Sequence, residues 1–250
     1  MQNKDRILVA LDTPEVAKAK QLSRDLQGHV GGVKLGLEFF NANGHAGVRE
    51  VVHGDDHLTP RGQSTPNQPL FLDLKFHDIP NTVAGAVRSV VPLNPKIINV
   101  HASGGEEMMR QALHAASFAA EPLGIMRPML IAVTILTSMS DEDVDAVGMR
   151  GPAMDQVVRL AALTQKCGLD GVVCSAREIE AIRRECGPDF KLIVPGIRPA
   201  GADKGDQKRT MTPVEAVQAG ADYLVIGRPI TQAADPVAAA QTIVRELDQG

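Results

Sequence analysis

Short aliphatic runs alternate along the chain with segments in which apolar residues recur at helical spacing. The aliphatic runs predict strands at residues 6–11, 32–35, 70–75, 97–100, 129–136, 171–174, 191–194 and 222–226. The amphipathic segments predict helices at residues 14–26, 38–52, 82–91, 106–119, 154–166, 176–185, 212–219 and 236–247. A predicted helix follows every predicted strand, and each pair averages about 31 residues, the length of one βα unit.

This strict alternation predicts a parallel sheet covered by helices, and eight units are enough to close such a sheet into a barrel. An open, doubly wound sheet is the alternative. However, the first strand is followed by Asp12-Thr13-Pro14 and not by the glycine-rich turn of a dinucleotide-binding fold. We therefore expect an α/β protein with a single (β/α)8 TIM-barrel domain over residues 1–250.

Two segments stand outside the alternating pattern. Residues 53–69 are polar and rich in proline, which predicts a surface-loop insertion. Residues 199–209 form a long, charged, glycine-containing segment between the seventh and eighth strands. Because loops of this length in compact domains are often lids, we expect this second segment to close over a binding site.

The composition is that of an ordinary globular protein, with 44% hydrophobic and 22% charged residues. Lys+Arg 26 against Asp+Glu 30 gives a net charge of −4, so the chain lacks the basic excess that nucleic acids or anionic membranes attract. No apolar run approaches the roughly 18 residues that span a bilayer. The chain has three cysteines, which cannot all form disulfides with one another. We therefore expect them to be reduced thiols. We expect a cytoplasmic protein that binds neither nucleic acid nor membrane.

Charged side chains stand at the ends of the first three predicted strands. Because residues two apart on a strand share a face, Asp73 and Lys75 point to the same side as Phe71. Asp12 and Lys34 end the first and second strands in the same way. One interpretation is a structural cluster of ion pairs at the barrel rim. Charge at three successive strand ends favours a catalytic set instead, because barrel enzymes keep their catalytic groups there.

The last two predicted strands end in glycine and arginine. Gly196 and Arg198 follow the seventh strand, and Gly227 and Arg228 follow the eighth. Barrels frequently bind phosphate with the loops after these two strands, and a guanidinium fits phosphate oxygens with two hydrogen bonds. A plain turn with a solvated arginine is the alternative interpretation. The position in the barrel favours a phosphorylated substrate.

The segment Asp73-Leu-Lys-Phe-His-Asp-Ile-Pro-Asn-Thr82 closely resembles the signature of the orotidine 5′-phosphate decarboxylase family, bacterial type. Further segments resemble that family in the same order: Ala10-Leu-Asp12, Val33-Lys34, Asn99-Val-His-Ala-Ser-Gly-Gly105, Leu136-Thr-Ser-Met139, Pro195-Gly-Ile-Arg-Pro199 and Ile226-Gly-Arg-Pro229. The resemblance covers nearly the whole chain apart from residues 53–69. It implies a TIM-barrel enzyme that converts orotidine 5′-phosphate to UMP and CO₂ in pyrimidine biosynthesis, with no cofactor and no metal.

Residue by residue, the resemblance implies an array of alternating charge made of Lys34, Asp73, Lys75 and Asp78, with Lys75 as proton donor to C6 of the pyrimidine. It implies an obligate homodimer in which Asp78, Ile79 and Thr82 reach the other subunit's site. The implied substrate-binding positions are Asp12 and Lys34 at the ribose, Asp73 at the carboxylate, Thr137 at the base, and Arg198, Gln207, Gly227 and Arg228 around the phosphate.

Two other functions remain compatible with these residues. The first is a Mg²⁺-dependent sugar-phosphate decarboxylase or isomerase of the same barrel superfamily, in which a similar Asp-x-Lys-x-x-Asp motif supports an enediolate. The second is a non-catalytic protein that binds nucleotide phosphates. Metal dependence distinguishes the first function, and ligand binding without turnover distinguishes the second.

Overall fold

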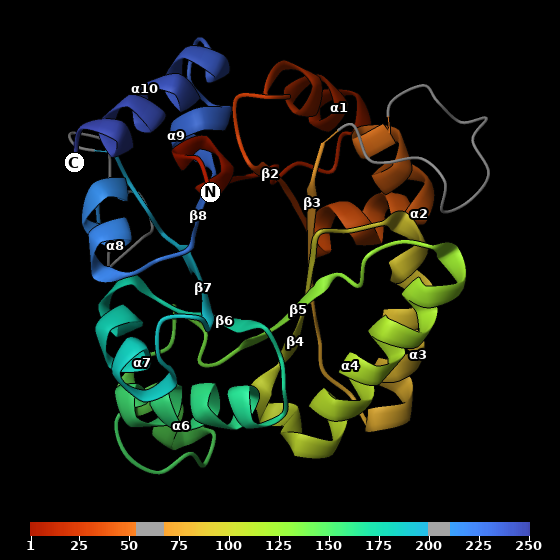
Figure 1. The fold of residues 1–250 in the computed structure, drawn as a ribbon, viewed down its shortest axis with the longest axis vertical. Coiled ribbons are helices and arrows are strands. Elements are labelled where there is room, and N and C mark those ends of the chain that lie inside the picture. Colours follow the sequence, from red (N-terminus) through yellow and green to blue (C-terminus); the bar gives the residue numbers. More distant parts are fainter. Residues whose placement is uncertain (54–67, 200–210) are drawn as a thin grey trace.

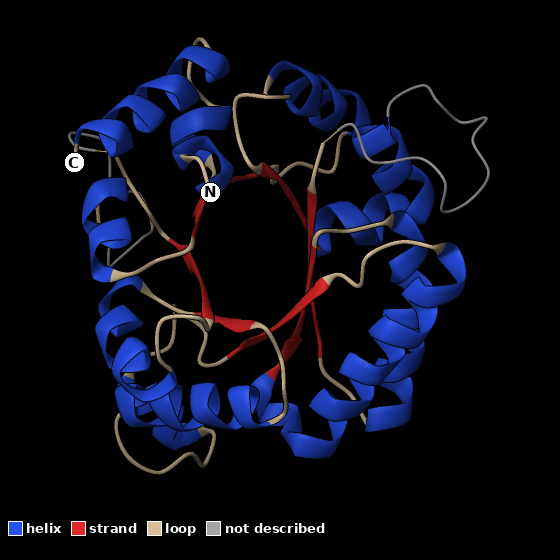
Figure 2. Ribbon diagram, viewed as in Figure 1, coloured by secondary structure: helices blue, strands red, loops and turns tan. Residues whose placement is uncertain are grey.

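The computed structural model describes residues 1–53, 68–199 and 211–250. In this part of the chain eight parallel strands close in chain order into one barrel, β1 pairing with β8. Helices surround the ring of strands (Figures 1 and 2). This architecture confirms the predicted single-domain TIM barrel. The strands are β1 (Ile7–Ala10), β2 (Gly32–Gly36), β3 (Leu70–Phe76), β4 (Ile97–His101), β5 (Met129–Val133), β6 (Gly171–Val173), β7 (Lys191–Pro195) and β8 (Tyr223–Ile226).

The α-helices of the described residues lie mostly where the periodicity predicts them. They are α1 (Val16–Asp25), α2 (Leu37–His53), α3 (Pro80–Val90), α4 (Gly105–Ala120), α5 (Asp141–Ala146), α6 (Ala153–Lys166), α7 (Ile179–Cys186), α8 (Pro213–Ala219), α9 (Arg228–Thr231) and α10 (Pro236–Gln249). None of these helices is long and apolar enough to cross a membrane.

The sequence prediction is wrong in three local details. The predicted strand at 129–136 ends at Val133, where pairing with β6 stops, and residues 134–136 lie outside the strand. Gly44 interrupts the predicted helix at 38–52 with φ 58° and ψ −157°, a conformation that glycine adopts without strain. The short helices α5 and α9 are not predicted, because four to six residues are too few to show a helical period.

The two predicted loop segments fall largely on residues 54–67 and 200–210, which lie outside the described residues. His53 is the last residue of α2, and Gln68 and Pro69 lead into β3. The surface-loop and closing-loop interpretations of these segments stay predictions.

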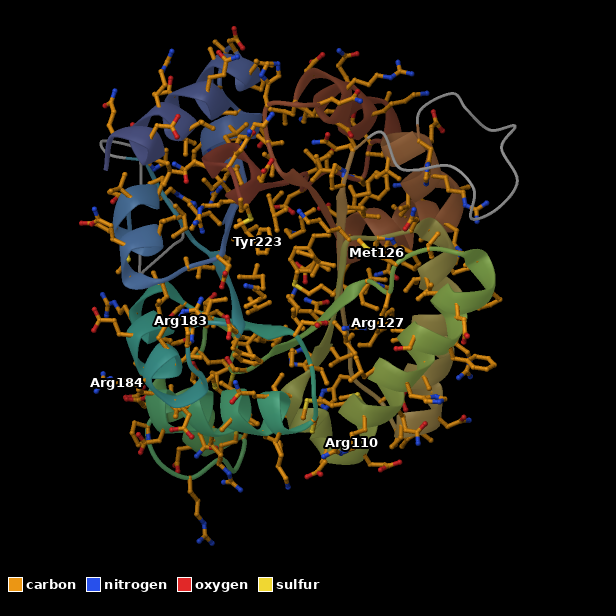
Figure 3. All side chains as sticks on the ribbon, viewed as in Figure 1. Arg110, Met126, Arg127, Arg183, Arg184 and Tyr223 are labelled. Atoms are coloured by element: carbon orange, nitrogen blue, oxygen red, sulfur yellow. The ribbon has the colours of Figure 1, made fainter. Side chains whose placement is uncertain are left out.

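Side chains alternate between two apolar layers along each strand. One layer fills the barrel interior and includes Phe71 and Tyr223. The other lies between the sheet and the helices and includes Leu72 and Leu74. Phe76 packs against this second layer too, so the predicted alternation along β3 is confirmed. Tyr223 points into the barrel (Figure 3), and the Lys96 ammonium lies 5.1 Å from its ring centre at the end where the strands begin.

Arg183 of α7 ties this same end of the barrel together. Its guanidinium pairs with Asp222, which directly precedes β8, and donates to the carbonyl oxygens of Gly220 and Phe190. Asp222 in turn accepts the N–H of Leu192 in β7 at 3.0 Å. The Arg183 side chain, 18% exposed, therefore provides donors for backbone carbonyls just before β7 and just before β8.

We predict that Arg183→Met lowers the free energy of unfolding by about 3 kcal/mol, because the substitution takes the guanidinium away from Asp222 and from several backbone carbonyls. Arg184→Met is the matched control, since Arg184 is exposed on the same helix and lies at the outer edge of the molecule (Figure 3). It should change stability by less than about 0.5 kcal/mol. Urea denaturation of both variants is the measurement, and equal midpoints would contradict the prediction.

Candidate active site

A cavity of about 500 Å³ opens at the end of the barrel where the strands finish. Residues from the carboxyl ends of β1, β2, β3, β5, β6, β7 and β8, or from the loops that follow them, line it. Those that carry a charge are Asp12, Lys34, Asp73, Lys75, Arg198 and Arg228. The acidic and lysine side chains come from the first three strand ends, and both arginines follow the last two strands. The charges that the sequence places at separate strand ends therefore line a single cavity.

The carboxylate of Asp73 lies between two ammonium groups. Lys75 Nζ is 2.7 Å from Asp73 Oδ1, and Lys34 Nζ is 3.3 Å from Asp73 Oδ2. Lys34 also contacts Asp12 Oδ1 at 3.3 Å. Asp73 and Lys34 are nearly buried, with side chains 11% and 12% exposed, whereas the Asp12 side chain is 68% exposed. A chain of alternating charge thus runs from the open rim into the cavity.

The surroundings of Asp73 keep it ionised. Burial alone would raise the pKa of Asp73, but the positive charges of Lys34 and Lys75 act in the opposite direction. Hydrogen bonds from Lys75 and Asn99 add to their effect, so the pKa of Asp73 is lowered below its ordinary value. Near neutral pH the cavity therefore contains a fixed carboxylate with a lysine on each side.

A bulge in β3 brings Lys75 to the cavity. Leu72 pairs with Ile98 of β4, and the next registered pair is Phe76 with Val100, so three residues of β3 stand opposite one residue of β4. Lys75 adopts φ 50°, which is uncommon for a residue other than glycine. Strained backbone of this kind is concentrated at functional sites, where the surrounding structure holds it in place.

The loops that follow β7 and β8 bring two arginines to the cavity. Gly196 and Arg198 follow β7, while Gly227 and Arg228 follow β8, and all four line the cavity. Arg228 is the first residue of the short helix α9. Arg198 is 9% exposed, and its guanidinium donates to the carbonyl oxygen of Ile197 at 3.0 Å. Gln207, predicted to lie near these groups, is outside the described residues.

Asp78, Ile79 and Thr82 do not line this cavity. All three are exposed at the start of α3, and the Ile79 residue is 67% exposed. Asp78 Oδ1 accepts the N–H of Ile79 at 2.6 Å. Within one chain, the predicted array of four charges is therefore an array of three plus a separate, outward-facing aspartate.

Thr137 lines the cavity as predicted, beside Ile135 and Leu136 of the same turn. Gln232, which lines the cavity from the end of α9, is not predicted from the sequence because that helix is too short. Asn99, which bonds to Asp73 and to the Lys75 backbone, is not predicted either. The available signal for Asn99 was a polar residue within an otherwise apolar strand.

The chain has close relatives of known name. A curated orotidine 5′-phosphate decarboxylase from Rhodospirillum rubrum is 55% identical over 241 residues, covering 96% of this chain and 93% of that protein. Another, from Moorella thermoacetica, is 50% identical over 249 residues, covering 99% and 94%. The crystal structure of orotidine 5′-phosphate decarboxylase from Lactobacillus acidophilus has a TM-score of 0.82 and 34% identity, covering 97% of this chain and 98% of that one.

A sequence model of the orotidine 5′-phosphate decarboxylase / HUMPS family matches residues 5–243. This span includes every strand of the barrel and every charged residue that lines the cavity. Relatives of about 50% identity extend over the same region. The chain therefore belongs to the orotidine 5′-phosphate decarboxylase / HUMPS family.

Proposed function

We propose that this protein decarboxylates orotidine 5′-phosphate to UMP and CO₂ in pyrimidine biosynthesis. The main support for the proposal is the cavity itself, which is lined by a Lys-Asp-Lys chain from β2 and β3 and by two arginines that follow β7 and β8. The printed names of relatives at 50–55% identity support the same substrate. Its phosphate and its reacting carbon would each meet groups of suitable charge.

The reaction needs positive charge and a proton at C6 of the pyrimidine, and the lysines of the cavity can supply both. When the bond from C6 to the carboxylate breaks, its electron pair stays on C6 and CO₂ leaves. The resulting carbanion needs stabilising positive charge and then a proton. In our proposal the Lys75 ammonium provides the charge, and its N–H bond then gives a proton to C6. Solvent returns a proton to the neutral amine, so the cycle balances without a cofactor.

Asp73 has two roles in this proposal. It orients both lysines through contacts of 2.7 and 3.3 Å, and it lies next to the substrate carboxylate. Two like charges 4 Å apart repel by about 4 kcal/mol at an effective dielectric constant near 20. This repulsion in the bound substrate is relieved as neutral CO₂ departs, which lowers the barrier to the reaction.

The remaining cavity residues are assigned to binding. Arg198 and Arg228 take the phosphate, with Gly227 allowing its close approach and Gln207 and the 199–209 segment completing the enclosure. Asp12 and Lys34 take the ribose hydroxyls, and the Thr137 hydroxyl takes the base. Binding energy gained at the phosphate then assists the reaction at C6.

The functional unit in this proposal is a homodimer. Asp78, Ile79 and Thr82 face outward from their own chain, and a 67% exposed isoleucine on that surface suits burial against a second copy. In the dimer, these three residues enter the partner's cavity. Asp78 there becomes the fourth charge of the array and lies beside the Lys75 ammonium of the partner subunit. We place the enzyme in the cytoplasm, where its buried thiols at Cys167, Cys174 and Cys186 stay reduced.

We predict that the purified protein consumes orotidine 5′-phosphate in excess EDTA, and that Lys75→Ala lowers kcat by at least about 1,000-fold. The lost ammonium removes both the stabilising charge and the proton donor. The pyrimidine absorbance gives the rate, and Lys166→Ala on the exposed face of α6 is the matched control. Turnover that requires Mg²⁺ would indicate a sugar-phosphate enzyme instead. UMP binding without turnover would indicate a binding protein.

Subunit complementation tests the dimer. Lys75→Ala and Asp78→Asn chains should each be nearly inactive alone, whereas a co-refolded mixture should regain about one quarter of the wild-type activity. Half of the dimers are then mixed, and one of the two sites in each mixed dimer combines an intact Lys75 with the other chain's intact Asp78. A mixture no more active than its components would show that Asp78 does not serve the partner's site.

A further inference from the structure

Asn99 is a buried polar residue that connects both members of the Asp73–Lys75 pair. It lies in the middle of β4 between Ile98 and Val100 and is 0% exposed. Its Nδ2 donates to Asp73 Oδ1 at 2.7 Å, and its Oδ1 accepts the backbone N–H of Lys75 at 2.8 Å. One amide thus contacts the acid through its side chain and the lysine through its backbone.

The bond to Lys75 replaces a backbone bond that the barrel does not supply. Leu72 pairs with Ile98 and Phe76 with Val100, so the residues of β3 between them have Asn99 alone opposite them. A bulge of this kind leaves backbone groups without partners in the ladder. The side-chain carbonyl of Asn99 accepts the hydrogen bond from the Lys75 N–H. This bond supports the φ of 50° that directs the lysine into the cavity.

The bond to Asp73 sets the rotation of its carboxylate. Oδ1 receives both Asn99 Nδ2 and Lys75 Nζ, each at 2.7 Å, whereas Oδ2 faces Lys34 Nζ at 3.3 Å. Because the amide donor comes from β4, which is paired with β3 and β5 on its two sides, it fixes which carboxylate oxygen each lysine meets. Without it, the carboxylate could rotate and pair with the two lysines in other ways.

We propose that Asn99 is a positioning residue for the decarboxylation. It holds the Asp73 carboxylate and the Lys75 backbone in the arrangement in which the Lys75 ammonium faces C6 of the pyrimidine, and it does not touch the substrate itself. This inference rests on the proposed function for its kinetic consequences. The two hydrogen bonds on which it stands are independent of the substrate.

The test compares two substitutions that remove different parts of the amide. Asn99→Leu removes donor and acceptor at similar volume, while Asn99→Asp keeps an acceptor for the Lys75 N–H and loses the donor to Asp73. Each should lower kcat for orotidine 5′-phosphate by about 10- to 100-fold, the range expected for a lost hydrogen bond to a charged group. The affinity for UMP should change by less than about threefold, because the phosphate contacts are intact.

The pH profile separates positioning from general loss of structure. A substituted carboxyl at position 99 would be buried beside Asp73, so its pKa would be raised. As the pH falls from 8 to 5, this carboxyl takes up a proton and can donate to Asp73 in place of the amide. The kcat defect of Asn99→Asp should therefore shrink in acid, whereas that of Asn99→Leu should not. Among the described residues, the other ionisable groups around Asp73 and His101 are the same in both variants: Asp12, Lys34, Lys75, His77 and His101.

Thr164→Val is the stability control, because Thr164 is also 0% exposed and hydrogen-bonded but lies on α6 away from the cavity. It should keep wild-type kcat even if its unfolding midpoint falls as far as those of the Asn99 variants. Three results would each overturn the proposal: kcat of Asn99→Leu within threefold of wild type, identical pH profiles for the two Asn99 variants, or an equal loss of kcat in Thr164→Val.

A measurement without substrate keeps this proposal separate from the proposed function. Carbon-13 NMR titration of the Asp73 carboxyl should give a higher pKa in Asn99→Leu than in the wild type, because a hydrogen bond to the charged form is lost. If the wild type fails to decarboxylate orotidine 5′-phosphate, the proposed function is wrong, and this titration still decides the role of Asn99. An unchanged pKa would overturn it.

Discussion

Asp73 shares its carboxylate between two lysines at the mouth of the barrel, and the rest of the site depends on that contact. Removing three charged groups from water is costly, and the cost is offset only if their mutual geometry is good. Lys75 and Lys34 approach different oxygens of the same carboxylate, which keeps the two ammonium groups apart. The arrangement therefore concentrates positive charge in a partly desolvated cavity, where it acts on a substrate more strongly than in water.

The barrel can tolerate this costly arrangement because the interactions that stabilise the fold and the residues of the cavity lie at opposite ends. At the end where strands begin, two Arg-Asp ion pairs bridge neighbouring strands. Arg127, just before β5, pairs with Asp170, just before β6. Arg183 of α7 pairs in the same way with Asp222, just before β8. Each aspartate also accepts a backbone N–H of the neighbouring strand. These pairs satisfy backbone groups far from the cavity. The strand ends on the opposite side can then carry unfavourable features, including the β3 bulge and the strained backbone of Lys75.

Much of this could be predicted from the sequence, and the exceptions have physical reasons. The 31-residue alternation predicts the barrel, and the two-residue period of β3 correctly directs Phe71 and Asp73 inward. Lys75 also reaches the cavity, although β3 bulges there. Strand register is set by tertiary pairing, so no local sequence pattern predicts the bulge. For the same reason, none predicts the role of Asn99 opposite it. The kink at Gly44 and the four-residue helix α9 are likewise too local for periodicity to detect.

In the proposed mechanism, Lys75 exchanges a proton with C6 of the pyrimidine while the cavity stabilises a carbanion there. Hydrogen exchange at C6 of UMP tests this step, because exchange is the final protonation run in reverse. The protein and UMP are incubated in D₂O, and proton NMR follows loss of the C6 hydrogen signal. We expect exchange with the wild type and none above the protein-free rate with Lys75→Ala. Equal exchange with both proteins, or no exchange with the wild type, would contradict this mechanism.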